Sequence, residues 1–363
     1  MSNESVLVDA EHLRRLADAI VRNGGSDEDE AAIVADHLVR ANLAGHDSHG
    51  VGMLPTYVRL LGAGLLKPGD GPELVTDEGA VLHFDGCRGY GQRVGKEAME
   101  AAIARCLETG VVVMALRNTS HLGRIGTYGE QSIAEGLVSI HFVNVTDHAP
   151  LVAPYRGTDA RFSTNPICLA MPGTATTEPT LLDMATSKVA LGKVRVAYNK
   201  GVELPPESLI DTAGRATNDP GVMFQQPRGA LLPIGGYKGY GLALFCDLFA
   251  GILSGGGTLQ PENERRGGLL NQMLTIVLDP ERLVTRSWLE SQVDALIAHV
   301  KASPAAAPDE PVLVAGDPER LTRSKRQRDG VPIDTTSWEE ILDAAERVGL
   351  STEQSLELAG LQS

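Results

Sequence analysis

The sequence has few cysteines, and none of them are closely paired. Its four cysteines, Cys87, Cys106, Cys168 and Cys246, are widely spaced in 363 residues and form no Cys-X-X-Cys motif. A chain of this length buries roughly three quarters of its unfolded surface, so it needs no disulfide or metal to hold its fold. We therefore expect free thiols in a reducing compartment, which favours a cytoplasmic location.

Long apolar runs and positive charge are also scarce. We expect no secretory signal at the polar N-terminus, and the apolar segment 241–253 is interrupted by Asp247 and is too short to cross a bilayer. The chain has 32 Lys and Arg against 47 Asp and Glu, which gives a net charge of −15. Such a surface repels phosphate backbones and anionic membranes, so we expect neither nucleic acid nor a membrane as a partner.

Several familiar nucleotide-binding and catalytic motifs are absent as well. The glycine-rich segments 89–95, 123–129 and 235–241 lack the G-x-G-x-x-G spacing that follows a strand in Rossmann enzymes. The sequence contains no P-loop, no H-E-x-x-H and no G-x-S-x-G motif. Its nine histidines do not cluster with cysteines or acids at the spacing of metal ligands. We therefore expect a different type of nucleotide site, if any, and no metal centre.

Apolar patterning predicts helices at both ends of the chain and strands in its middle. Short β-branched runs predict strands at 111–116, 138–145 and 273–278, and a shorter strand at 312–315. The remaining expectations are helices within 1–45 and at 53–61, 123–135, 186–198, 337–348 and 351–361, a long surface excursion at 201–221, a buried helix at 239–253, an amphipathic helix at 287–301 and a linker at 302–311. This order predicts helical ends packed together around a mixed α/β unit.

Polar residues interrupt the apolar elements at five places. The segments are 48–50, 120–126, 164–166, 182–187 with Lys193 shortly after it, and 236–241. In the first, a serine beside a histidine can orient the ring or relay a proton. In the second, a strand leads into a helix start whose free N–H groups favour an anion, and Arg124 can hold a carboxylate or a phosphate.

Each segment also has a purely structural interpretation. Ser48 and His49 could form a turn at a helix end, and Arg124 could be a surface charge. Asp183 could cap a helix, with Thr186 nearby, and Lys193 could be a solvated side chain. The glycines near Lys238 could cradle a nucleotide or only form a tight turn. Taken one at a time, the segments leave these alternatives open.

Together, and in this order, the segments resemble the type 2 malate/L-lactate dehydrogenase family of non-Rossmann NAD(P)-dependent oxidoreductases. The resemblance extends over essentially the whole chain, from 43–50 through 161–166 to 330–333. It implies a mixed-sheet α/β fold that binds NAD, with NADP as the alternative, and a homodimer with its active site at a domain cleft. It also implies two parts: a helical domain for substrate and dimerisation, formed by 1–117 with 309–363, and an NAD(P)-binding domain at 118–308.

The resemblance further implies reversible hydride transfer between the nicotinamide and a 2-oxo or 2-hydroxy acid, of the phenylpyruvate, 2-oxoglutarate, malate or lactate type. His49 would be the acid/base, Ser48 its relay partner, and His121 a second catalytic histidine, while Thr164 would contact the substrate. Cofactor contacts are expected at His49, Gly123, Arg124, Ile125, Leu181, Leu182, Asp183, Met184, Tyr237, Lys238, Asn271, Gly316, Asp317, Pro318 and Glu319.

Two positions bear on the substrate. The imine-reducing members of the family, which act on Δ1-piperideine-2-carboxylate, carry an acid where this chain has Lys193, and a cation there favours polarising a carbonyl. Ureidoglycolate and sulfolactate dehydrogenases remain alternatives. Many members bind the substrate carboxylate with an arginine where this chain has Met53. Because a buried carboxylate without a cation is costly, we expect Arg124 to supply that charge, or else to bind the cofactor pyrophosphate.

Overall fold

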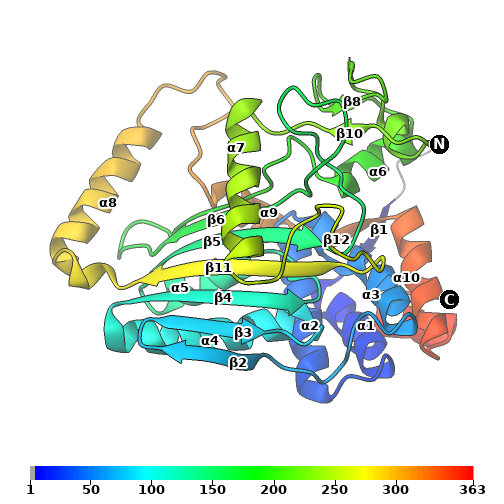
Figure 1. Cartoon of the computed structure of the whole chain (residues 1–363), viewed down its shortest axis with the longest axis horizontal. Coiled ribbons are helices and arrows are strands. Elements are labelled where there is room, and N and C mark those ends of the chain that lie inside the picture. The colour runs from blue at the N-terminus through cyan, green and yellow to red at the C-terminus, as the bar shows by residue number, and fades with distance from the viewer. Residues whose placement is uncertain (1–4, 363) are drawn as a thin grey trace.

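A seven-stranded mixed sheet forms the centre of the computed structural model, which describes residues 5–362 apart from the side chains of Asn199 and Lys200. The strand order is β2-β3-β4-β11-β5-β6-β7 (Figure 1), and only β3 and β4 run parallel. The strands are β2 (Glu73–Glu78), β3 (Val81–Asp85), β4 (Val111–Thr119), β5 (Val138–Thr146), β6 (Ile167–Met171), β7 (Thr180–Met184) and β11 (Leu270–Leu278). The expected mixed sheet and its strands β4, β5 and β11 are confirmed.

Different helices cover the two faces of this sheet. Helices α4 (Gly91–Thr109) and α5 (Gly126–Ala134) pack on one face, where Val143 and Met273 join their apolar core. The next residue of each strand points to the other face. There Asn144 donates a hydrogen bond at 3.0 Å to Asp247, in the π-helical segment η4 (Asp247–Ile252) that continues α7 (Tyr237–Cys246).

The two ends of the chain share one helical core beside the sheet. Strand β1 (Ser5–Val8) pairs antiparallel with β12 (Val331–Asp334). The helices of this core are α1 (Ala10–Asn23), α2 (Glu28–Leu43), α3 (Leu54–Gly62), α10 (Thr335–Arg347) and α11 (Thr352–Leu358). In α1, Leu13, Leu16 and Ile20 recur at helical spacing and are buried in it. The packing of the N- and C-terminal helical segments against each other is confirmed.

The sheet begins earlier in the chain than the sequence indicates. Strands β2 and β3 and helix α4 precede residue 117, and Leu82 and Phe84 of β3 pack with α4 in the sheet core. The expected division between residues 117 and 118 therefore falls inside β4. The core of the helical unit is formed mainly by residues before β2 and by residues from β12 onward.

The structure overturns or refines four smaller expectations. Residues 312–315 form no strand but a turn closed by the Asp317 side chain, which leads into α9 (Asp317–Asp329). The helix expected from 186 is α6 (Leu191–Lys200). The excursion 201–221 is folded: its strands β8 (Leu209–Ile210) and β9 (Ala216–Thr217) join β10 (Ala230–Leu231) in a small sheet.

The fourth concerns the segment 239–253, which is not fully buried. One side of α7 and η4 packs on the sheet, but apolar side chains on the other side are exposed, including Phe245 at 48% and Ile252 at 55%.

Helix α8 (Arg286–Lys301), at the left of Figure 1, has no buried side chain. Within residues 5–362, no helix has both the length and the apolar character needed to span a membrane.

Candidate active site

Ser48 and His49 lie in a short break between α2 and α3. The break consists of two 3₁₀ turns, η1 (Asp47–His49) and η2 (Val51–Met53). The Asn42 side chain fixes it to α2, since its Oδ1 accepts a 2.8 Å hydrogen bond from the amide of Val51. A Cβ at Gly50 would lie 2.2 Å from that oxygen, so only glycine fits there. The Oγ atom of Ser48 lies 3.0 Å from Nδ1 of His49, which orients the ring.

His121 joins this pair from the loop between β4 and α5. Its ring stacks on that of His49, with 5.5 Å between the centroids and 21° between the planes. Asn271 of β11 holds the loop, because its Oδ1 accepts a 2.7 Å hydrogen bond from the amide of Leu122. The structure thus brings together two histidines expected to be catalytic and assigns Asn271, an expected cofactor ligand, to support of the loop.

Burial keeps both rings neutral near pH 7. It lowers the pKa of His49 to about 4; the charge of Asp183 opposes this shift, while His46 and Arg124 add to it. Burial and the neighbouring His49 hold the pKa of His121 well below its usual range. A neutral imidazole can accept a proton at its free nitrogen. His49 therefore has the protonation state of a general base, with one nitrogen already oriented by Ser48.

Asp183 lies on edge strand β7 with its side chain 7% exposed. Its Oδ2 accepts a 2.7 Å hydrogen bond from the amide of Gly126, the first residue of α5. A carboxylate is favoured there because the N-terminus of a helix carries partial positive charge. Asp183 is thus a helix cap, as one interpretation of the sequence proposed, but for α5 rather than for the helix that follows it.

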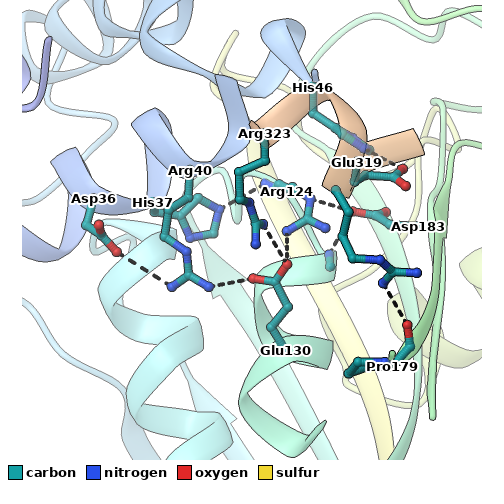
Figure 2. Close-up of polar contacts among 12 residues, drawn as sticks. Asp36, His37, Arg40, His46, Arg124, Glu130, Pro179, Asp183, Glu319 and Arg323 are labelled. Atoms are coloured by element: carbon teal, nitrogen blue, oxygen red, sulfur yellow. Dashed lines mark hydrogen bonds and ion pairs between the residues drawn. The ribbon is translucent and has the colours of Figure 1, made fainter. Parts of the chain in front are cut away.

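Arg124 is embedded in a charged network rather than free to bind an anion (Figure 2). Its side chain is 1% exposed, its Nη1 donates to Glu130 at 2.8 Å, and its Nε lies 4.0 Å from Asp183. Arg40 and Arg323 contact the same glutamate. Burial alone would raise the pKa of Glu130, but the charges of Arg124 and Arg40 outweigh that effect and lower this pKa to about 2. This pairing argues against the expectation that Arg124 replaces a missing carboxylate ligand.

The other expected substrate residues lie on three separate segments of the chain. Met53 ends η2 and packs, partly buried, on the helical core. Lys193 is exposed on α6, and the adjacent Gly192 packs so tightly on η1 that a Cβ there would lie 2.9 Å from Cβ of Ser48. Thr164 precedes β6, and its carbonyl accepts a 2.9 Å hydrogen bond from the amide of Thr186, just beyond Asp183.

Two of the segments expected to hold a cofactor lie against α2 and the turn that follows it. Glu319, in the first turn of α9, lies 3.2 Å from His46 through Oε1, while its buried Oε2 has no partner in the described part of the chain. Gly123 has φ +74°, and a Cβ there would lie 2.4 Å from His37. A free carboxylate oxygen suits a ribose hydroxyl, as in other dinucleotide sites. The residues present therefore fit a dinucleotide.

The remaining expected cofactor residues differ in exposure. Tyr237 and Lys238 are exposed at the start of α7, and Leu182 is exposed on β7. Ile125 and Leu181 are buried in the sheet core, so their side chains face away from solvent. The other expected cofactor residues lie at the ends of two elements: Met184 ends β7, and Gly316, Asp317 and Pro318 stand at the start of α9. Among residues 5–362, no group of three or more His, Cys, Asp or Glu side chains is placed to hold a metal.

Sequence reasoning missed four residues of this region. His37 accepts a 3.0 Å hydrogen bond from the amide of Arg124, and Glu130 neutralises that arginine. Tyr57 and Gln92 form a hydrogen-bonded chain behind His121. Glu130 follows Arg124 by six residues on the next helix, which is the one local signal. The other three come from distant helices, and nothing in the local pattern marks them.

Comparison with known proteins identifies the family. The malate/L-lactate dehydrogenase model matches residues 8–342. Hydroxycarboxylate dehydrogenase B of Escherichia coli K12, which the segments 42–53, 123–126 and 138–143 resemble, is 45% identical over 347 residues, covering 95% of each chain.

Solved structures of related enzymes have the same fold as this chain. An E. coli structure of the malate/lactate dehydrogenase type has a TM-score of 0.93 at 43% identity, covering 98% of this chain and 99% of that one. A Δ1-piperideine-2-carboxylate reductase from Pseudomonas syringae has a TM-score of 0.81 at 27% identity, covering 94% and 100%. The chain therefore belongs to the malate/L-lactate dehydrogenase family, a family of oxidoreductases acting on CH–OH groups.

Proposed function

We propose that the protein transfers a hydride reversibly between NAD(H) and a small 2-oxo or 2-hydroxy acid, with NADP as the alternative cofactor. The observation that supports this most is the stacked pair of His49 and His121, with Ser48 3.0 Å from Nδ1 of His49. When bound, a nicotinamide supplies or accepts the hydride. The protein then has to supply or remove one proton at the substrate oxygen.

His49 performs that proton transfer. In the reductive direction, its protonated ring donates from Nε2 to the substrate oxygen as C2 receives the hydride, while Ser48 accepts a hydrogen bond from Nδ1–H. In the oxidative direction, the neutral ring takes the hydroxyl proton as the hydride leaves C2. Because burial lowers the pKa of His49 to about 4, the oxidative direction finds the base already in its reactive form at neutral pH.

The charge of Asp183 should be visible in the pH dependence of oxidation. Asp183 raises the pKa of His49 against the effect of burial, so Asp183→Asn removes that support and lowers this pKa further. Oxidation needs the neutral ring, so the midpoint of the acid limb in the pH profile of kcat/KM for oxidation should move to lower pH in this variant. An unchanged midpoint would contradict this electrostatic role.

Lys193 supports a 2-oxo acid as the substrate. It follows Gly192, which packs against the turn that carries Ser48, and we assign its cation to polarising the substrate carbonyl, with Thr164 contacting the substrate. A cation there disfavours a developing iminium charge, which argues against Δ1-piperideine-2-carboxylate. Met53 makes the pocket more apolar than an arginine would, so we expect larger side chains such as that of phenylpyruvate to be accepted; sulfolactate and ureidoglycolate are the other candidates.

A cofactor-oxidation assay tests the proposed reaction. NADH or NADPH is offered with phenylpyruvate, 2-oxoglutarate, pyruvate, oxaloacetate, sulfopyruvate or Δ1-piperideine-2-carboxylate, and the absorbance of the reduced cofactor is followed. Oxidation of NADH by at least one 2-oxo acid is the expected result. Turnover with the cyclic imine alone would overturn the interpretation of Lys193, and no turnover with any acid in either direction would overturn the proposed function.

We also propose that the protein is a cytoplasmic homodimer whose contact includes the outer face of α7 and η4. Phe245, Ile252 and Leu253 are exposed on this face, and a contiguous apolar patch is typical of a covered surface. Light scattering should give twice the 38.5 kDa chain mass, and Ile252→Asp should shift it toward one chain. Leu107→Asp, at a similarly exposed position on α4, is the control. A monomeric unmodified protein would contradict this proposal.

A further inference from the structure

A buried hydrogen-bonded chain reaches His121 from behind. Tyr57 of α3 is its central residue, and the Tyr57 hydroxyl lies 2.8 Å from Nδ1 of His121. Gln92, in the first turn of α4, donates from Nε2 to the same hydroxyl at 2.6 Å. Tyr57 and Gln92 are each 1% exposed. Three separate elements thus place one phenol oxygen between an amide and an imidazole, away from solvent.

The directions of these hydrogen bonds follow from the donors available. An amide nitrogen can only donate, so the Tyr57 oxygen accepts from Gln92 and its single proton points to the nearest acceptor, Nδ1 of His121. A neutral imidazole that accepts at Nδ1 carries its own proton at Nε2. In this orientation the buried Oε1 of Gln92 has no partner in the described part of the chain. The reverse chain would turn the amide over and take the partner away from its N–H group instead, and orphaned N–H groups are rarer than orphaned carbonyl oxygens.

Burial keeps both groups in these protonation states. It raises the pKa of Tyr57 far above its usual range, so the phenol retains its proton at any working pH. It lowers the pKa of His121, so the imidazole stays neutral. A phenol is more acidic than a neutral imidazole, which makes O–H the better donor and the imidazole nitrogen the better acceptor of the two. The chain therefore has one favoured direction.

We propose that Tyr57, supported by Gln92, fixes His121 as the Nε2–H tautomer, so that this histidine donates a hydrogen bond to the substrate and does not act as a second base. Tyr57 is a positioning residue, and this inference rests on the proposed function. The two stacked histidines then have different roles. His49 moves the proton, while His121 holds the substrate oxygen or carboxylate through an N–H group that needs no reorganisation during the reaction.

The tautomer can be measured without turnover. The full-length protein is labelled with ¹⁵N-histidine, and the ring nitrogens of His121 are assigned by their loss in His121→Gln. We expect a protonated Nε2 and an unprotonated Nδ1. Tyr57→Phe should give a mixture of tautomers. Gln92→Glu should reverse the chain, because its carboxylate accepts a hydrogen bond from the phenol O–H and the Tyr57 oxygen then accepts one from Nδ1–H of His121. Tyr90→Phe, which removes the hydroxyl of the ring packed edge-on against Tyr57, should leave the tautomer unchanged.

Kinetics complete the test. In Tyr57→Phe, kcat for the accepted 2-oxo acid should fall about tenfold, which is less than the roughly hundred- to thousandfold loss found when a preorganised donor is removed outright, while the KM for NADH stays within about twofold. A protonated Nδ1 in the unmodified protein, or the same tautomer in Tyr57→Phe, would overturn the inference. If no acid is turned over but the tautomers respond as expected, the hydrogen-bonded chain stands and the proposed function fails.

Discussion

Replacement of His49 by glutamine should lower kcat for 2-oxo acid reduction about a thousandfold, within the range of general acid–base catalysis. Glutamine keeps a polar side chain of similar reach but cannot take up or release a proton. Binding of NADH, followed by its fluorescence, should change by no more than about threefold, because the other expected cofactor residues stay in place. The loss should be similar in the oxidative direction, since the same ring serves as base.

Ser48→Ala is the matched control for this change. It removes the 3.0 Å contact to Nδ1 but keeps the imidazole, so the expected loss in kcat is about tenfold, in line with one orienting hydrogen bond. An activity of His49→Gln within about tenfold of the unmodified protein would show that another group transfers the proton, because general acid–base catalysis contributes more than that.

Replacement of Arg124 by methionine should mainly destabilise the fold. The guanidinium is buried between Glu130 and Asp183, and removal of one partner from a buried ion pair costs about 3–5 kcal/mol. Urea unfolding should record a loss of this order. Arg40→Met removes a more exposed arm of the same network and should cost about 1 kcal/mol or less. The KM for the 2-oxo acid should stay within about threefold for both variants.

The opposite pattern would restore the expectation from the sequence. Suppose that Arg124→Met left stability intact and raised the KM for the 2-oxo acid more than about thirtyfold, which is roughly 2 kcal/mol of lost binding. Arg124 would then be the residue that binds the substrate carboxylate, a role that Met53 cannot fill. An unchanged KM together with an unfolded or strongly destabilised variant would assign Arg124 to the charged network of Figure 2.

The sequence predicted the parts of this site that depend on local order. Ser48 and His49 lie in the polar break because Asn42, Asp47 and Gly50 shape the chain within a few residues of them. The three central strands could likewise be read from their own β-branched residues. Both predictions needed only neighbours along the chain.

What could not be predicted depends on residues far apart in the sequence. Arg124 has Glu130 six residues along the chain as its one local signal, but only the fold brings Asp183 and the other arginines of the network to it. Nothing near His121 in the sequence indicates Tyr57 or Gln92. The apolar residues of 239–253 look like core, because hydrophobicity alone does not distinguish a protein interior from an exposed apolar surface. Residues 312–315 are apolar enough for a strand, but the Asp317 side chain bonds to the amide of Val314 and closes a turn.

Transfer of deuterium tests the central claim most directly. The protein is given a 2-oxo acid that it reduces and NADH carrying deuterium at one face of C4, and the product is examined by mass spectrometry and NMR. The account predicts a 2-hydroxy acid with one deuterium on C2 from one labelled face and none from the other, with loss of this product in His49→Gln. An unlabelled product from both cofactors would contradict direct hydride transfer to C2.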